Sequence, residues 1–518
     1  MLRSLWRPLL LAVLLTGYLV ALLPWQGFVD PDAFYHATLS HLLWQVGPVQ
    51  DFAALDLTLV GQSFADLHFG FHVFVAPFTA LFGPLPGLRI ATLCLSLMFF
   101  ATFYIILRRE RISYAEWWVG LLALSAPFSF RLLLGKATPL ALLLQLLGTW
   151  AVLRRRPWLA FLTGMGFALS HGGWPYLAGS AFLILMSEIL YSRVVRTASW
   201  VSSFSLSPWR EVGAVWAGVV VGLLLHPNRT NLLSFAWTQI VTIGLKTPLD
   251  QVALGKEWLP AAPGMVLASL APWAILLLLA ILGICLAPRK IFDEAHARGA
   301  LCFAVITGAL VALSFKSWRN VEYLVPTICL CLACLWQLID IKKLLSLFCH
   351  SRENGNLSVR SSKIPTFVGM TIFFLLSAQA TFAVWRGFHP SPFPDAMFQE
   401  VMGQISERAV PSDRVFHVWW DDFPMLFAAD HRLRYVSGLD PTFLYVVNPV
   451  LSDELHELMR HPASSTQDAI WQMVHEKTHS RFLFLDLRRD GELLKIVEKD
   501  PRYAKVSENS EAVAWEVR

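Results

Sequence analysis

Apolar runs of roughly 17 to 23 residues recur along the first three quarters of the chain, beginning with RPLLLAVLLTGYLVALL at residues 7–23. A helix of that length crosses the hydrocarbon core of a bilayer. The composition agrees, because 55% of the 518 residues are hydrophobic and only 15% are charged, against about a quarter in soluble domains. The sequence therefore predicts an α-helical polytopic membrane protein.

Basic residues gather in the short loops between these runs, which is the pattern of the positive-inside rule. The six clusters are Arg3/Arg7, Arg108/Arg109/Arg111, Arg154/Arg155/Arg156, Arg193/Arg196, Arg289/Lys290 and Lys342/Lys343. With all six clusters in the cytoplasm, the predicted helices cover 9–24, 86–107, 115–130, 139–153, 158–170, 174–192, 211–226, 265–287, 299–315, 321–339 and 364–385. We therefore expect about eleven spans in an inner (plasma) membrane, a cytoplasmic N-terminus and a periplasmic segment after Trp385. The formal charge of +5 reflects this topology and indicates no nucleic-acid partner.

The apolar segment DLHFGFHVFVAPFTALF, residues 66–82, is short for a span and is interrupted by two histidines and a proline. Counting it as a span would place the next basic cluster outside and break the charge pattern. We therefore predict an interfacial or re-entrant helix within a long first external loop, residues 25–85. Charged groups at membrane depth are tolerated where they line a protein cavity, so we expect the functional site in this loop.

The loop begins with VDPDAFYHATLSHLL, residues 29–43, a dense group of ionisable and aromatic side chains. Asp30 before Pro31 is typical of a helix start, with a carboxylate at the N-cap and proline at the first helical position. Asp32 then falls in the first turn and shares a helix face with His36, four residues later. Because capping does not need Asp32, we predict a catalytic role for it, with Asp30 beside it.

A second group repeats the arrangement, with Asp66 near a helix start and with His68 and His72 four residues apart. Asp30 and Asp66 are also explained as helix caps, and the histidines as residues that face lipid headgroups. A two-histidine, one-carboxylate metal site is a further alternative.

Two other external segments carry charged candidates. Glu257 lies in GKEW, within a second long outer loop at 226–263, and either approaches the cavity or is a surface acid beside Lys256. Arg319 lies at the outer end of a span, against the charge rule. It either holds a lipid phosphate or pairs with Glu322.

The segment from 386 to 518 is predicted to be a small soluble α/β domain outside the membrane, joined to a transmembrane domain at 1–385. The predicted strands are RVFHVWW, LRYVSG, RFLFLDL and AVAWEVR, and the predicted helices cover 396–408, 450–460, 466–477 and 491–498. Its many aromatic and polar residues suggest that it folds over the membrane cavity and helps to hold a substrate.

The order of parts and the run DAFYH, starting at Asp32, resemble the first-loop motif of the GT-C membrane glycosyltransferases. The likeness is to the catalytic subunit of oligosaccharyltransferase and its bacterial single-subunit relatives, and it extends over roughly residues 1–240. In that family an acidic residue of the first loop binds a metal and orients the acceptor. The resemblance places this role on Asp32, and Asp66 and His68 would be further ligands of Mg²⁺ or Mn²⁺.

In VWWDDFP, Trp419, Trp420 and Asp421 are similar to the WWD acceptor-binding element of the same family. The family's second external loop carries an acidic pair for the metal, whereas the corresponding RLLLGKATPL has Arg131 and Lys136 and no acid. This departure suits a lipid donor with a single phosphate that basic side chains hold without metal.

These features predict a glycosyltransferase of the cell envelope that moves a sugar from a polyprenyl-phosphate donor to a glycan, lipid or protein acceptor. Asp32 is the expected base or acceptor-orienting acid, His36 a substrate contact, and Arg131, Lys136 and Arg319 the expected phosphate ligands. No P-loop, Rossmann fingerprint or serine elbow occurs, so no nucleotide donor is expected. Two rivals stay open: a transporter or lipid-handling protein without catalysis, and a degenerate GT-C scaffold that only binds.

Overall fold

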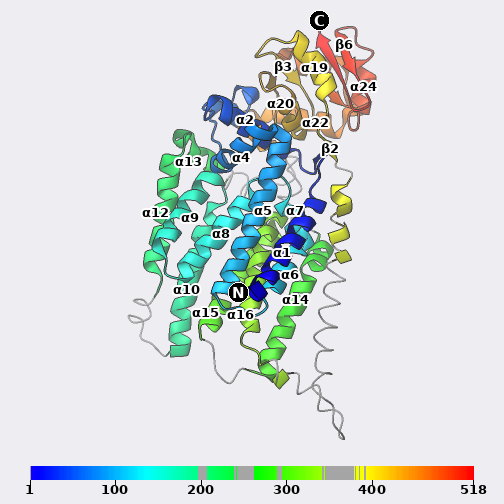
Figure 1. Cartoon of the computed structure of the whole chain (residues 1–518). Helices are drawn as coiled ribbons and strands as arrows, with labels where there is room; N and C mark the ends of the chain where they lie inside the picture. The colour runs from blue at the N-terminus through cyan, green and yellow to red at the C-terminus, as the bar shows by residue number, and fades with distance from the viewer. Residues whose placement is uncertain are drawn as a thin grey trace.

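The computed structural model describes residues 2–196, 207–238, 262–288, 294–340 and 392–518, together with a few residues between these ranges. Figure 1 shows a long bundle of helices with a smaller unit of strands and helices at one end. The first loop, residues 23–83, lies between the bundle and this unit, so it is covered from both sides.

The described bundle helices follow the apolar runs of the sequence. They are α1 (Leu2–Leu22), α5 (Pro84–Arg109), α6 (Ala115–Ala123), α7 (Ala126–Leu132), α8 (Thr138–Leu153), α9 (Pro157–Ser170), α10 (Trp174–Arg196), α12 (Trp209–Leu225), α13 (Arg229–Trp237), α14 (Pro263–Leu286), α15 (Glu294–Lys316) and α16 (Val321–Trp336). Among the described residues, four helices are long and apolar enough to cross a membrane, and the bent pair α12 and α13, at 119°, makes up to five. The chain is a multi-pass membrane protein, while the expected count of eleven spans and its orientation stay predictions.

The predicted spans up to residue 339 coincide with helices, with one exception. The segment 115–130 forms two helices, α6 and α7, because Ser125 is extended and Pro127 follows within the first turn of α7. Most of the predicted span 364–385 lies outside the described residues.

Small residues allow α9 and α12 to pack closely. A Cβ atom at Gly164 would lie 2.4 Å from the carbonyl oxygen of Val215, and one at Gly218 would lie 2.1 Å from that of Phe161. Any larger side chain at either position would force the two backbones apart. The glycines of these two apolar segments therefore fix a helix pair beneath α13 and the first loop.

The first loop is mostly helical. It contains β1 (Gly27–Phe28), α2 (Asp32–Val46), the short helices η1 (Ala53–Leu55) and α3 (Leu59–Gln62), and α4 (Phe69–Phe82). The helix predicted within 66–82 is present as α4, and with 14 residues it is shorter than a span. Its interfacial or re-entrant position stays a prediction. Helix α4 packs against α2 and α5, which places the polar start of α4 beside α2.

The C-terminal part contains a five-stranded mixed sheet with the order β4-β3-β5-β7-β6. The strands are β3 (Arg414–Phe416), β4 (Arg434–Tyr435), β5 (Phe482–Asp486), β6 (Tyr503–Glu508) and β7 (Ala512–Val517). Strand β3 is parallel to β4 and β5, whereas β7 is antiparallel to β5 and β6. The helices are α19 (Gln399–Arg408), α20 (Phe423–Ala429), α21 (Thr442–Val447), α22 (Pro449–Arg460), α23 (Gln467–Trp471) and α24 (Gly491–Val497). All four strand segments predicted from the sequence contain strands, and β6 is an addition.

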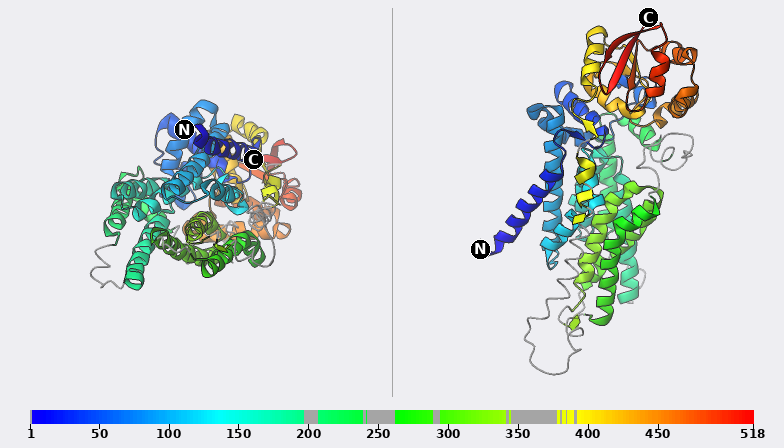
Figure 2. Two further views of the ribbon diagram at one scale, coloured as in Figure 1. Left: turned by 60° about the horizontal axis from the view of Figure 1, so that its bottom comes forward. Right: turned by 90° about the vertical axis from the view of Figure 1, so that its right-hand side faces the viewer.

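The first loop and the C-terminal part share one hydrophobic core. It includes Phe34 and Phe52 from the loop and Phe427 and Tyr435 from the C-terminal part. Strand β1 pairs with β2 (Phe393–Pro394) in an antiparallel two-stranded sheet. The start of the first loop is therefore joined to a segment more than three hundred residues later in the sequence, and the right-hand view of Figure 2 shows the yellow strand beside the blue first loop.

Ion pairs at the edge of this core strengthen the same contact. Asp56 accepts two hydrogen bonds from Arg414, at 2.8 and 2.7 Å, and one from Arg434, at 2.9 Å. On the bundle side, the buried Arg89 pairs with Asp395 and donates to the carbonyl oxygens of Pro24 and Gly27. Because these pairs are partly buried, they fix the position of the loop more than they add to stability.

Candidate functional site

Lys136 joins the two acids at the start of α2. Its Nζ lies 2.7 Å from Asp30 Oδ2 and 2.8 Å from Asp32 Oδ2. The backbone N–H of Asp32 donates to Asp30 Oδ1 at 3.0 Å, so Asp30 also acts as the predicted cap. Both acids and the lysine are mostly buried, which makes this a preorganised group of charges.

The turn before Lys136 is shaped to approach α2. Gly135 has φ +72°, a conformation that favours glycine, and a Cβ atom there would lie 3.1 Å from the Cβ of Ala33. The glycine therefore lets the turn between α7 and α8 come close to the first turn of α2. This approach carries the lysine side chain to the two carboxylates.

A chain of buried side chains continues from α2 into α4. His36 Nδ1 lies 2.8 Å from His72 Nε2, and His72 Nδ1 lies 2.7 Å from Asp66 Oδ2. The backbone at Asp66 is held from the bundle, because His226 Nε2 lies 2.9 Å from its carbonyl oxygen and Asn228 accepts its N–H. The Asp66 end of this chain of hydrogen bonds is thus anchored to the bundle.

Other histidines and an arginine surround this chain. The His68 ring lies 5.1 Å from that of His36 and 5.3 Å from that of His171. Burial, the neighbouring His72 and the positive charges of Arg319 and Lys136 together lower the pKa of His68 to about 3, against the opposing effect of Asp66. Arg319 therefore belongs to the same electrostatic environment as the first-loop residues, and its role as a phosphate ligand stays a prediction.

Arg131 has a different arrangement from the one expected. Its Nε donates to Glu322 Oε2 at 2.9 Å, and both side chains are almost fully buried. The sequence suggested Arg319 as the partner of Glu322, whereas the structure pairs this acid with Arg131. Glu322 therefore orients the Arg131 guanidinium and competes with any phosphate for it.

Comparisons with known proteins test the resemblance. No family model matches the sequence, and no curated protein sequence matches it. Among the similar solved structures, archaeal oligosaccharyltransferase AglB from Archaeoglobus fulgidus, in complex with an inhibitory peptide and a dolichol-phosphate, has a TM-score of 0.66 and 11% identity over 97% of this chain and 73% of its own. ArnT from Cupriavidus metallidurans bound to undecaprenyl phosphate has a TM-score of 0.58 and 14% identity, covering 98% of this chain and 96% of its own. Arabinofuranosyltransferase AftD from Mycobacteria has a TM-score of 0.57 and 14% identity, covering 98% and 39%.

These proteins are GT-C glycosyltransferases, and each aligns over almost the whole of this chain. The chain has the GT-C fold. The resemblance seen in the sequence is confirmed at the level of the fold, and the comparisons do not favour the transporter alternative.

Among the described residues, no group of three or more His, Cys, Asp or Glu side chains is placed to hold a metal ion. Asp32 is occupied by the Lys136 ammonium group and Asp66 by His72, so the predicted ligands Asp32, Asp66 and His68 do not converge. The Lys136 ammonium group holds the two carboxylates together, as a metal cation would.

The WWD element lies in the C-terminal part, directly after β3, where its side chains already have partners. Trp419 Nε1 donates to Asp490 Oδ1 at 2.8 Å, and Asp421 accepts two hydrogen bonds from Arg489, at 2.9 and 3.1 Å. Arg489 also lies over the Trp419 ring, at 4.5 Å from its centroid. Trp420 lines a small apolar pocket beside these residues.

The sequence did not single out His72 or Arg489 as functional residues. Glu257, a predicted substrate contact, lies outside the described residues. His72 was seen only as part of an i, i+4 pair, and its spacing to His68 was the available signal. Arg489 was missed because the basic run after β5 meets the WWD element only in the fold.

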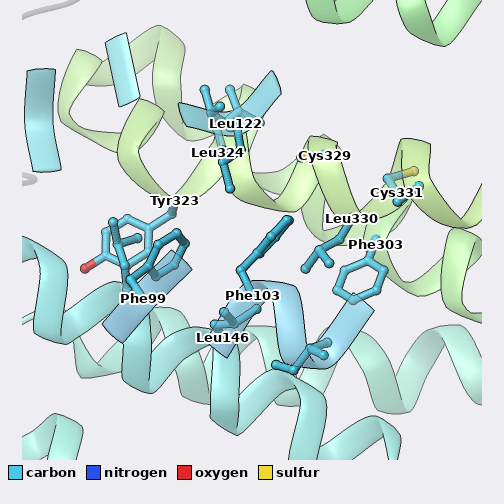
Figure 3. Close-up of a cluster of buried hydrophobic side chains, with 14 of the residues drawn as sticks. Phe99, Phe103, Leu122, Leu146, Phe303, Tyr323, Leu324, Cys329, Leu330 and Cys331 are labelled. Atoms are coloured by element: carbon cyan, nitrogen blue, oxygen red, sulfur yellow. The ribbon is translucent and has the colours of Figure 1, made fainter. Parts of the chain in front are cut away.

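A pocket lies within the bundle between α5, α8, α15 and α16, and its volume of about 960 Å³ includes the open solvent at its mouth. Figure 3 shows its lining side chains Phe99, Leu146, Phe303, Tyr323 and Leu330 facing one another from these helices. At the Tyr323 end the cavity approaches Arg319, whereas charged residues such as Glu110 and Arg154 line the opposite end. The walls between are mainly apolar.

Proposed function

We propose that this protein is a GT-C-type glycosyltransferase that moves a sugar from a polyprenyl-phosphate-linked donor to a glycan, lipid or protein acceptor. The observation that carries the proposal is the Asp30–Lys136–Asp32 group at the junction of the first loop and the bundle. Support comes from AglB and ArnT, since their structures contain a dolichol-phosphate and undecaprenyl phosphate, respectively. These lipids share one phosphate on a long isoprenoid chain.

The charges of the site suit the departure of a phosphate. In the reaction the bond between the anomeric carbon and the phosphate oxygen breaks, and negative charge collects on the departing lipid phosphate. Lys136 and Arg319 supply positive charge beside the acids of α2, where burial strengthens each interaction. Arg131, which is paired with Glu322, contributes a further positive charge.

Asp32 is our proposed contact for the acceptor, either taking its proton or orienting its hydroxyl group. The ion pair with Lys136 fixes the carboxylate, and 27% of the Asp32 side chain stays exposed, so a substrate hydroxyl can reach it. The apolar cavity between α5, α8, α15 and α16 would accommodate the isoprenoid chain of the donor. WWD residues Trp419, Trp420 and Asp421 would meet the acceptor from the C-terminal part.

The proposed location is an inner membrane with the N-terminus in the cytoplasm. The basic clusters Arg108/Arg109 and Arg154/Arg155 support this orientation, because they gather at the bundle end opposite the first loop. The first loop and the C-terminal sheet would then face the periplasm, where polyprenyl-linked sugars without nucleotides serve as donors. Glu257, in the second long outer loop, stays a candidate substrate contact.

The test compares Asp32→Asn with the matched control Asp51→Asn, which changes an exposed acid of the same loop. The polyprenyl-linked sugar that accumulates in cells without the protein identifies the donor. If Asp32 takes or orients the acceptor proton, transfer should fall by roughly 100-fold or more. Thermal stability should stay close to that of the unaltered protein. Transfer by Asp32→Asn at the unaltered rate would contradict the proposal.

A further inference from the structure

The hydrogen bonds between Asp66, His72 and His36 determine where their protons lie. An ionised Asp66 only accepts, so His72 must carry its proton on Nδ1 and donate it to Asp66. A neutral His72 then has a lone pair on Nε2, and His36 must donate to it from Nδ1. The lone pair of His36 is therefore on Nε2. A buried carboxylate thus sets the tautomer of a histidine two hydrogen bonds away.

The position of His36 places this lone pair in the candidate site. His36 is four residues after Asp32 on α2, so the two side chains share one face of the helix. His68 packs against its ring, and Lys136 and His171 act on it electrostatically. His36 itself is 4% exposed, which keeps bulk water from competing for the ring.

We propose that Asp66, His72 and His36 form a proton-accepting relay for the transfer reaction, in which His36 Nε2 receives the proton of the acceptor hydroxyl. This inference rests on the proposed function and assigns to Asp32 the orientation of that hydroxyl. The acceptor oxygen forms a bond to the anomeric carbon, and the bond from that carbon to the phosphate oxygen breaks. The electron pair leaves with the polyprenyl phosphate, and the hydroxyl proton passes to His36. His72 and Asp66 are positioning residues.

The ionisation of the group agrees with these protonation states. Burial lowers the pKa of His36 well below its usual value, and the positive charge of Lys136 lowers it further. Burial alone would raise the pKa of Asp66, but its contacts with His72 and His68 lower it overall. His36 is therefore neutral and Asp66 charged at neutral pH. The relay is ready to accept a proton before the substrate arrives.

A merely structural role is the competing explanation, because the same hydrogen bonds also attach α2 to α4. The two roles differ in kinetics. A structural contact that is lost lowers stability and weakens donor binding, whereas a lost proton acceptor lowers kcat and leaves the KM for the donor nearly unchanged. Added imidazole can replace a missing histidine ring only where that ring handles a proton.

The experiment uses the full-length protein in lipid nanodiscs with the accumulated polyprenyl-phosphate sugar as donor. His36→Ala should lower kcat by roughly 100-fold or more, and added imidazole should raise the kcat of this variant at least about tenfold. His41→Gln, on the same helix but outside the relay, is the matched control. His72→Gln should give a smaller loss of kcat than His36→Ala. Combining these two changes should cost little more than His36→Ala alone, since the residues act as a unit.

The outcomes distinguish a failure of the proposed relay from a failure of the proposed function. If the unaltered protein consumes no polyprenyl-phosphate sugar, the proposed function fails, and the relay with it. If the unaltered protein transfers sugar while His36→Ala keeps kcat within threefold, or is not restored by imidazole, only the relay is overturned. Should His36→Ala fail to fold, an undiminished kcat in His72→Gln and in Asp66→Asn would overturn the relay instead.

Discussion

Replacing Lys136 with methionine removes the ammonium group between Asp30 and Asp32 and keeps most of the apolar stem. The two carboxylate oxygens can lie at most roughly 5.5 Å apart, because one nitrogen lies within 2.8 Å of both. At an effective dielectric constant of about 20, two like charges at that separation repel by about 3 kcal/mol. The acids are 18% and 27% exposed, so solvent screens part of this repulsion. We expect the free energy of unfolding to fall by about 1–3 kcal/mol.

Thermal unfolding in detergent, followed by intrinsic fluorescence, measures this loss. Two adjacent carboxylates without their ammonium group should bind a hard divalent cation. Millimolar Mg²⁺ or Mn²⁺ should therefore raise the Tm of Lys136→Met and leave that of the unaltered protein nearly unchanged. Lys495→Met, which breaks an exposed pair with Glu492, is the control and should change little. An unchanged Tm in Lys136→Met, or equal cation responses of both proteins, would refute this reasoning.

Four further outcomes are expected. A cysteine in place of Ser412 should react with an impermeant thiol reagent added outside cells and one in place of Ser351 should not, whereas labelling of the latter alone would invert the topology. Glu322→Ala leaves a buried guanidinium without its carboxylate and should cost about 3–5 kcal/mol, seen as a lower Tm; an unchanged Tm would contradict the pair. Arg489→Met should lower the Tm at pH 7 and regain part of it at pH 5, because burial raises the pKa of Asp422, so acidification neutralises this partner of Arg489; a pH-independent loss would argue against this. Chelators should leave sugar transfer intact, and activity lost in chelator but restored by Mn²⁺ would favour a metal enzyme.

Much of the helical architecture was predictable, because the length of an apolar run and the helix-breaking residues within it act locally along the chain. The span predicted at 139–153 is α8 from Thr138 to Leu153, where proline at the second position starts the helix. The break at Ser125 was missed because its flanks are equally apolar. Strand β6 was missed because it lies at the sheet edge and alternates with many polar residues.

The candidate site was only half predictable from the sequence. The cap at Asp30 and the shared face of Asp32 and His36 follow from helix geometry alone. The ion pairs of Asp30 and Asp32 with Lys136 join residues about a hundred positions apart. The pair of Arg131 with Glu322 likewise joins residues that are distant in the sequence. Such pairs depend on how helices pack, which spacing does not encode.

The pairing of β1 with β2 also sets an order of events during synthesis. Ribosomes add about 5–20 residues per second, so roughly 20–70 s separate the emergence of Phe28 from that of its partner Phe393. Throughout that interval the aromatic face of α2 lacks the surface supplied by α20 and Tyr435. A chain released before the sheet is made would contain Asp32, Lys136 and Arg319, yet the side of its first loop that faces away from the bundle would have nothing to pack against.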